Sequence, residues 1–198
     1  PYPAPVVVSA THPDPELQYG RRDATLSWWF DASGLEEAPG CSGGYYYTVD
    51  QISDTVPAQI PENYSAVNMT EALNLALGTH YLHVYGVDDC DIPTETAHFQ
   101  INIREALAPI VNFIYDLDTG NVAFSWIDPD NFAMGTPAYY YLLNNNPDYF
   151  IVPGAEGVTG SVETTRIYPN LEPGLWFFHV VSVDQHGNLS RQSLTVLT

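Results

Sequence analysis

The amino-acid sequence predicts an all-β protein built as two tandem β-sandwiches of seven strands each. Aromatic residues make up 13% of the chain, with tyrosine alone supplying 14 of the 198 residues, and stretches with a helical pattern are scarce. One series of aromatic segments occurs twice, with a spacing of about 96 residues. Short strand-like segments follow one another at regular spacing, which is typical of sandwiches.

The repeat is visible in matched landmarks that lie within the expected strands. These are Trp28 and Trp126, 98 residues apart, Tyr45 and Tyr139, 94 apart, and His83 and His179, 96 apart. The spacing changes only between strands, so insertions fall in loops. No nucleophile, acid and base recur together with the strands, which argues against an enzyme.

Each repeat supplies seven expected strands and one domain. In the first repeat the strands are expected at residues 5–11, 24–30, 45–50, 59–60, 65–71, 80–88 and 96–103, and in the second at 110–115, 121–127, 138–143, 149–152, 161–168, 175–184 and 193–197. Residues 69–77 also have fair helical propensity, but the β-branched residues at the matching positions 162–167 favour a strand. The predicted domains are 1–105 and 106–198, with a Pro-rich linker at residues 1–5.

The charge of the chain excludes some partners. Twenty-four Asp and Glu residues face five Arg and no Lys, for a formal net charge of −19. Such a surface repels nucleic acid and anionic membranes, so no nucleic-acid binding is expected. No apolar run approaches the 18 or so residues that membrane insertion requires, and a charged fraction of 15% is too low for disorder.

With the strands laid out, the chain resembles the fibronectin type III superfamily, in tandem. The resemblance is carried by Ser27-Trp28 and Ser125-Trp126, by the Tyr-rich segments that begin at Tyr45 and Tyr139, and by Leu171-Glu172-Pro173-Gly174. The last is similar to the family's Leu-x-Pro-Gly entry to a strand whose Tyr normally makes a corner hydrogen bond. Trp176 stands near that position, and His80 in the first repeat, so whether the corner bond forms is left open. The first repeat looks most like modules of large bacterial or archaeal surface proteins. Membership implies spacing, display or binding, without a particular ligand.

In such a sandwich the loops that carry Cys41 and Cys90 project from the same end, which favours a disulfide between them. On the loop-entropy model this bond would stabilise the fold by about 4 kcal/mol. Two free thiols are the alternative. A disulfide indicates export, so we expect an extracellular or cell-surface location.

Acidic loops form the candidate metal site. Asp88, Asp89 and Asp91 crowd one loop, and Asp116 with Asp118 and Asp128 with Asp130 form pairs in the second repeat. Carboxylates at alternate positions can bind Ca²⁺ through oxygen ligands. No twelve-residue calcium loop is present, and acidic loop tips that simply face water are the plainer interpretation. The cofactor prediction is therefore none, with calcium at the first cluster as the alternative.

Strand alternation predicts a candidate ligand face. Leu82, Val84, Phe178 and Val180 are expected to point inward, so that their neighbours His83 and His179 point outward. The predicted face is the outer side of the sheet and consists of Tyr46, Tyr81, His83, Tyr85, Tyr140, Phe177 and His179. Such a stripe could stack on sugars or pack against a neighbouring domain. A covered or solvated sheet face is the favoured alternative.

Three Asn-x-Ser/Thr patterns, at Asn63, Asn68 and Asn188, mark candidate glycosylation sites. Neither a Gly-x-Ser-x-Gly motif nor a phosphate-binding glycine loop is present. We therefore expect a non-catalytic extracellular module, a spacer or interaction domain of a larger surface, adhesive or filament-forming protein. Its partners would be other domains or subunits. The alternatives are a glycan-binding or calcium-dependent adhesion module and an accessory domain of a secreted hydrolase.

Overall fold

The computed structural model describes residues 2–30, 44–88, 91–116 and 118–198. The chain divides into two compact units, Pro1–Arg104 (unit 1) and Glu105–Thr198 (unit 2). The predicted boundary lies one residue further along the chain.

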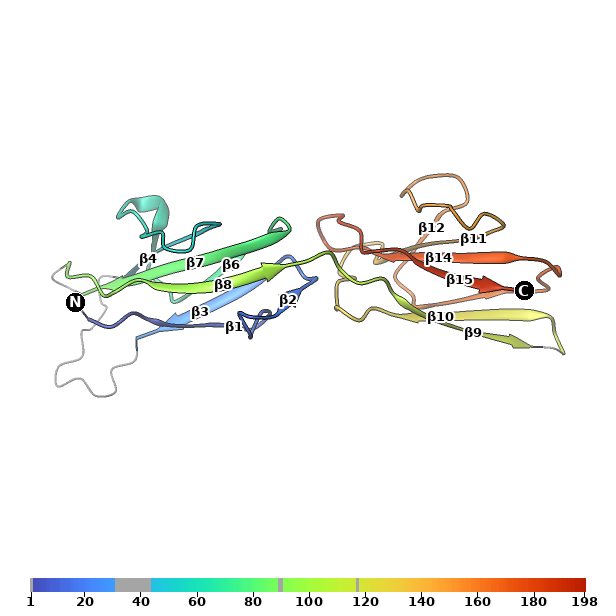
Figure 1. The fold of residues 1–198 in the computed structure, drawn as a ribbon, viewed down its shortest axis with the longest axis horizontal. Coiled ribbons are helices and arrows are strands. Elements are labelled where there is room, and N and C mark those ends of the chain that lie inside the picture. Colours follow the sequence, from blue (N-terminus) through green and yellow to red (C-terminus); the bar gives the residue numbers. More distant parts are fainter. Residues whose placement is uncertain (1, 31–43, 89–90, 117) are drawn as a thin grey trace. The chain divides into compact units, whose positions relative to one another are not determined.

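Unit 1 consists of two sheets (Figure 1). Its strands are β1 (Val6–Ser9), β2 (Gln18–Tyr19), β3 (Ala24–Trp29), β4 (Gly44–Asp50), β5 (Tyr64–Ser65), β6 (Met69–Ala72), β7 (Gly78–Val87) and β8 (Ala97–Ile103), with a 3-10 turn η1 (Pro61–Asn63). One sheet has the order β1-β3-β6 and the other the order β2-β8-β7-β4-β5. The segment for which a helix was the alternative contains the strand β6 instead.

Unit 2 has the same two-sheet construction. Its strands are β9 (Ile110–Asp116), β10 (Asn121–Ile127), β11 (Tyr139–Asn144), β12 (Thr159–Ser161), β13 (Thr165–Tyr168), β14 (Trp176–Ser182) and β15 (Ser193–Leu197). The sheets have the orders β13-β10-β9 and β12-β11-β14-β15. The predicted all-β fold class is confirmed, and both units are consistent with fibronectin type III-like sandwiches.

Two details of the predicted strands are wrong. Residues 59–60 and 149–152 are not strands; the short strands β5 and β12 pair with β4 and β11 instead. The sequence also gave no sign of β2, which pairs in parallel with β8 over two residues. A two-residue strand has no periodicity, so only its partner reveals it.

Each unit has its own core, built by alternating side chains. In β3 and β10 every second residue points inward, which buries Leu26 and Trp28 in unit 1 and Phe124 and Trp126 in unit 2. The two tryptophans have equivalent surroundings: Trp28 meets Tyr45, and Trp126 meets Tyr139, each edge-on at 5.8 Å and 73°. The repeat is therefore a repeat of packing as well as of sequence.

The hairpin between β9 and β10 shows why the turn residues are needed. Gly120 has φ of 67°, a region that favours glycine, and its N–H donates to the Asp116 carbonyl at 2.8 Å. The Asp116 carboxylate accepts hydrogen bonds from Thr119 Oγ1 and from the Asp118 N–H. These bonds hold the pKa of Asp116 below its ordinary value.

The first residues of the chain pack on unit 1. Tyr2 forms a parallel bridge with Thr94, its carbonyl accepts the Glu95 N–H at 2.7 Å, and Pro5 is buried. Residues 2–5 thus differ from the free linker that their prolines predicted. No helix among the described residues has the length and apolar character needed to cross a membrane.

Candidate functional site

The predicted ligand face lies on the outer side of the β7 and β14 sheets, but it is covered. Alternation is as expected, because Leu82, Val84, Phe178 and Val180 are fully buried. The outward histidines His83 and His179 are nevertheless 0% exposed, and Tyr85 and Phe177 only 7%. The prediction of an open ligand face is therefore wrong for these four residues, and the alternative of a covered sheet face is correct for them.

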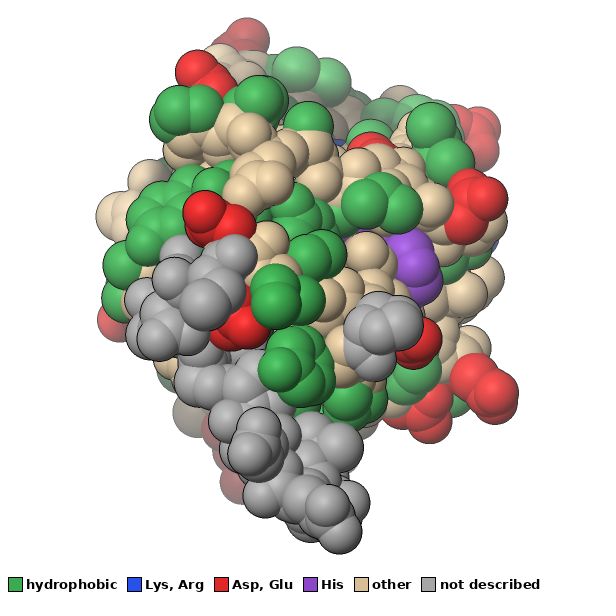
Figure 2. Space-filling view, turned by 90° about the vertical axis from the view of Figure 1, so that its left-hand side faces the viewer, with side chains coloured by type: hydrophobic (Ala, Val, Ile, Leu, Met, Phe, Trp, Pro, Cys, Tyr) green, Lys and Arg blue, Asp and Glu red, His purple; other side chains and the backbone are tan. Residues whose placement is uncertain are grey.

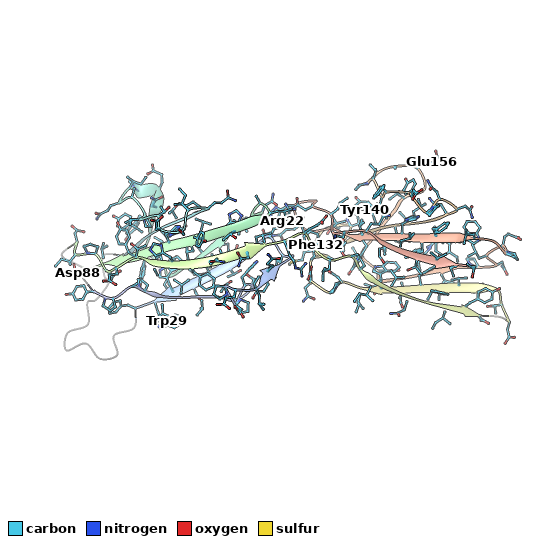
Figure 3. The ribbon with its side chains drawn as sticks, viewed as in Figure 1. Arg22, Trp29, Asp88, Phe132, Tyr140 and Glu156 are labelled. Carbon is cyan, nitrogen blue, oxygen red and sulfur yellow. The ribbon has the colours of Figure 1, made fainter. Side chains whose placement is uncertain are left out.

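In each unit, the connection between two neighbouring strands of this sheet contacts the outer face. Crossover 1 (residues 51–63) follows β4, and crossover 2 (residues 145–158) follows β11. Crossover 2, which carries the labelled Glu156, lies on the side of unit 2 away from β9 (Figure 3). Pro57 and Ile151 are the buried residues within these two segments.

His83 anchors the cover in unit 1. Its Nε2 lies 3.1 Å from Asp50 Oδ1 and its Nδ1 lies 2.6 Å from His98 Nδ1. A carboxylate only accepts, so His83 Nε2 carries the hydrogen, and in the neutral pair the His98 Nδ1–H donates to His83. Asp50 also accepts the Ile52 N–H at 2.8 Å, which ties the start of crossover 1 to the same group.

Two pKa shifts accompany this arrangement. Burial lowers the pKa of His98, and the nearby His83 lowers it further, while Asp54 acts in the opposite direction. Partial burial raises the pKa of Asp50, but hydrogen bonds from Ile52, Thr55 and His83 outweigh it, so the pKa lies below its ordinary value. The site therefore favours a charged carboxylate beside a histidine pair.

His179 occupies the equivalent position in unit 2 with a different set of partners. Its Nε2 lies 3.0 Å from the Asn146 carbonyl and 3.2 Å from Asn144 Oδ1, and its Nδ1 lies 3.0 Å from Gln192 Nε2. Gln192 in turn accepts the Ile151 N–H at 2.8 Å and donates to the Tyr149 carbonyl at 2.7 Å. Burial lowers the pKa of His179, which the hydrogen bond to Asn146 partly offsets.

The remaining residues of the predicted face are partly buried. Tyr46 stacks on Tyr85 at 5.5 Å and meets Tyr64 edge-on at 5.6 Å, and Tyr81 stacks on His83 at 6.0 Å. Tyr140 lies in β11 and is partly buried; it is labelled in Figure 3. Tyr46 thus packs against Tyr64 and Tyr85, and Tyr81 packs on His83.

The acidic loop after β7 has a counterpart after β14, and both are closed by an aspartate. Asp88 Oδ1 accepts the Ile92 N–H at 2.8 Å. Asp184 accepts three bonds, from the backbone N–H groups of His186 and Asn188 and from Asn188 Nδ2. Asp88 is labelled at the end of unit 1 in Figure 3. The carboxylates of Asp88 and Asp184 therefore stabilise the turns that follow β7 and β14.

The metal and disulfide predictions depend on residues outside the described part of the chain. Asp89, Cys41 and Cys90 are not described, so the calcium and disulfide hypotheses stay predictions. In the described ranges, no group of three or more His, Cys, Asp or Glu side chains is placed to hold a metal. On the face shown in Figure 2, acidic side chains are spread among apolar and polar ones.

The acidic pairs of unit 2 have backbone partners. Asp116 closes the β9–β10 turn, while Asp128 accepts the Asp130 N–H at 3.2 Å and Asp130 accepts the Leu107 N–H at 2.7 Å. Among the three glycosylation patterns, Asn68 is exposed, whereas the side-chain amides of Asn63 and Asn188 donate to the Ala58 carbonyl and to Asp184. Glycosylation stays a prediction.

The corner bond that the sequence left open is made in both units. Trp176 Nε1 donates to the Glu172 carbonyl at 2.9 Å, and His80 Nε2 lies 2.8 Å from the Ala76 carbonyl. Each bond reaches back four residues, so a tryptophan and a histidine serve one role at equivalent positions. Because a carbonyl only accepts, His80 carries its hydrogen on Nε2.

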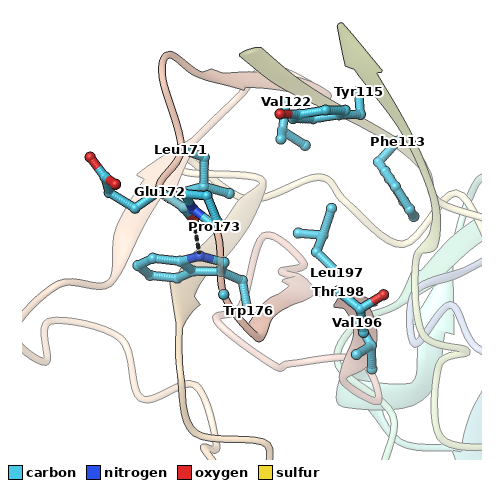
Figure 4. A pocket seen from close by; sticks show the side chains of 11 residues that line it. Phe113, Tyr115, Val122, Leu171, Glu172, Pro173, Trp176, Val196, Leu197 and Thr198 are labelled. Atoms are coloured by element: carbon cyan, nitrogen blue, oxygen red, sulfur yellow. Dashed lines mark hydrogen bonds between the residues drawn. The ribbon is translucent and has the colours of Figure 1, made fainter. Parts of the chain in front are cut away.

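A cavity that the sequence did not predict lies between the sheets at the end of unit 2 (Figure 4). Its volume is about 350 Å³. It is lined by Phe113, Tyr115, Val122, Leu171, Glu172, Pro173, Gly174, Trp176, Val196, Leu197 and Thr198. Phe113 and Tyr115 alternate with the outward residues of β9, yet their side chains are 43% and 48% exposed. The sandwich is therefore incompletely closed at this end, and only the structure reveals it.

Comparisons with known proteins add little to this description. The sequence matches no family model and no curated protein sequence. The chain is similar to a solved structure of fibronectin(III)-like modules of CbhA from Clostridium thermocellum, with 12% identity over 96% of this chain and 92% of that one, at a TM-score of 0.34. A likeness at that TM-score does not bear on function.

Proposed function

We propose that this chain is a non-catalytic extracellular module that acts as a structural spacer or interaction domain in a larger surface, adhesive or filament-forming protein. The observation that carries the proposal is the use of reactive side chains for structure at equivalent positions of both units. His83 and His179 hold the crossovers, Asp88 and Asp184 close the turns, and the corner positions bond to backbone carbonyls.

This structural use of histidine and aspartate supports a non-catalytic role, because a catalytic side chain must be free to contact a substrate. A general base must lie within hydrogen-bond reach of a substrate proton. Both strand histidines are fully buried with both ring nitrogens in contact. A scaffold of two similar sandwiches needs the same loops held in place twice. The repeated histidines and aspartates meet that need in both units.

The alternatives differ from the spacer in their response to ligands. Thermal melting of the full chain in excess EDTA and again in about 2 mM CaCl₂, above the dissociation constants of roughly 0.1–1 mM that extracellular calcium modules show, tests the calcium alternative. The spacer predicts equal melting temperatures. A rise in calcium that disappears in a variant with Asp88, Asp89 and Asp91 changed to Asn would support calcium-dependent adhesion. An equivalent variant at Asp116 and Asp118 is the matched control.

Glycan binding is tested on an array with the wild-type chain and with Tyr46→Ala and Tyr140→Ala. The spacer predicts no glycan-dependent signal. Saturable binding that either substitution abolishes would replace the spacer with a carbohydrate-binding module, while a hydrolase domain encoded beside this chain in its parent gene would favour the accessory-domain alternative.

The extracellular part of the proposal rests on the predicted Cys41–Cys90 bond. Peptide mapping of the air-oxidised chain without reductant should recover the two cysteine peptides as one linked species. Two alkylated free thiols would remove this support for export.

A further inference from the structure

We infer that crossover 2 of unit 2 is an acid-released latch: it stays closed on the sheet while His179 is neutral and opens when His179 takes up a proton, whereas crossover 1 stays closed over the same pH range. The inference goes beyond the proposed function. It rests on the donors and acceptors around two equivalent histidines.

The bonds around His179 admit one protonation state. Nε2 faces two oxygens, the Asn146 carbonyl and Asn144 Oδ1, so it must carry a hydrogen. Nδ1 faces the amide nitrogen of Gln192 at 3.0 Å, so it must accept. A proton on Nδ1 would set one N–H against another.

Gln192 cannot turn over to relieve this conflict. Its Oε1 accepts the Ile151 N–H at 2.8 Å and its Nε2 donates to the Tyr149 carbonyl at 2.7 Å. Both partners belong to crossover 2. A flip of the amide would break both bonds, and so would movement of the side chain away from an imidazolium. Either response frees residues 149–151 of crossover 2 from Gln192, while the Asn146 carbonyl keeps its bond to His179 Nε2.

No charged group bonded to His179 among the described residues offsets the proton. β11 contributes Leu142 and Asn144, and β15 contributes Leu194, none of which ionises. From crossover 2, the Tyr149 ring lies 5.9 Å away. The exposed Asp148 makes its described bond through its backbone N–H to Asn146 Oδ1.

The equivalent site in unit 1 tolerates a proton. The position of Asn144 is taken by Asp50, whose carboxylate lies 3.1 Å from His83 Nε2. His83 Nδ1 faces His98 Nδ1, and a proton added to Nε2 of the exposed His98 keeps the Nδ1–H donating to His83. Tyr81 on β7 and Asp54 in crossover 1 also face this pair. The His83–His98 pair can therefore take up one proton beside the negatively charged carboxylate of Asp50.

The measurement is amide hydrogen exchange of the full chain, corrected for intrinsic rates, at pH 7.5, 6.5 and 5.5. One proton taken up on opening raises the opening constant by at most about tenfold per pH unit. With an ordinary pKa of about 6.5 for the histidine in the open state, we expect a rise of up to about fivefold between pH 6.5 and 5.5 for residues 145–158, with little change for residues 51–63. Equal protection of crossover 2 at pH 7.5 and 5.5 would overturn the inference.

Two reciprocal variants sharpen the test. Asn144→Asp gives unit 2 the carboxylate of unit 1 and should reduce the pH dependence of crossover 2, while Asp50→Asn should create one in crossover 1. His179→Gln removes the titrating ring and should leave exchange of residues 145–158 independent of pH; retained wild-type pH dependence in this variant also overturns the latch. If His179→Gln does not fold, an NMR titration of the wild type decides: an imidazolium at His179 with crossover 2 still protected contradicts the inference.

Discussion

At the scale of single residues, side chains of different chemistry perform one role in the two units. His80 and Trp176 both reach back four residues to a carbonyl. Asp50 and Asn144 both contact the buried strand histidine, at 3.1 and 3.2 Å. What the fold requires at these positions is a donor or acceptor at the correct distance, so the residue type can vary as long as that atom is supplied.

Removal of the corner bond should cost a small, measurable amount. Trp176→Phe keeps an aromatic ring but loses the N–H, so we expect a loss of about 0.5–1.5 kcal/mol in the free energy of unfolding. Urea denaturation of the full chain measures it. Trp29→Phe is the matched control, because Trp29 is 45% exposed and should be near neutral. Equal effects of the two substitutions would contradict a role for the bond.

Buried neutral histidines should make the fold sensitive to acid. His12 is 0% exposed, with Nδ1 2.9 Å from Thr11 Oγ1 and Nε2 3.0 Å from the Arg21 carbonyl, and burial lowers its pKa below 6.5. The folded state then binds fewer protons than the unfolded state. Stability is complete above pH 6.5 and falls as the pH drops below it, with a slope of at most about 1.4 kcal/mol per pH unit for each such group.

Urea midpoints between pH 7.5 and 5.0 measure this slope. His12→Gln should lower stability at pH 7.5 but give a shallower fall towards pH 5.0. A wild-type midpoint that stays constant, or a variant slope as steep as that of the wild type, would show that His12 is not one of the responsible groups.

At the scale of elements, the turns that follow β7 and β14 repeat as faithfully as the strands themselves. After β7 and β14, Thr94 and Ser190 each accept a backbone N–H from the strand, from Gly86 at 3.0 Å and Ser182 at 2.9 Å. Each also donates its hydroxyl to the next carbonyl at 2.8 Å. The sequence spacing of 96 residues is kept through these turns, because their hydrogen bonds require a fixed number of residues.

The Asp184 turn should therefore be sensitive to truncation. Asp184 is 7% exposed and its carboxylate accepts three bonds from part-buried donors, so Asp184→Ala removes three hydrogen bonds to a charged group and should cost about 1–3 kcal/mol. Chemical denaturation checks the value, with Asp148→Ala on the surface as the control. A cost below that of the control substitution would mean that the turn closes without its carboxylate.

At the scale of the whole molecule, two separate cores predict two separable stabilities. Phe178 lies at the centre of the unit 2 core, with Phe124 stacked on it at 4.1 Å, and no residue of unit 1 belongs to that cluster. Phe178→Ala should cost unit 2 about 3–5 kcal/mol. Calorimetry should then show one transition shifted and one unchanged, with Phe150→Ala, at 77% exposure, as the neutral control. A single shifted transition would show that the two units unfold together.

Short-range pattern in the sequence was sufficient for the all-β class, most strand positions and the inward side of β3, β7, β10 and β14. These follow from backbone alternation and side-chain shape, which neighbouring residues impose on one another. Burial of the outward-facing His83 and His179, by contrast, depends on segments that fold back over the sheet from elsewhere in the chain. Only the tertiary structure decides that contact, because alternation gives the side of a sheet on which a residue lies but not what covers that side.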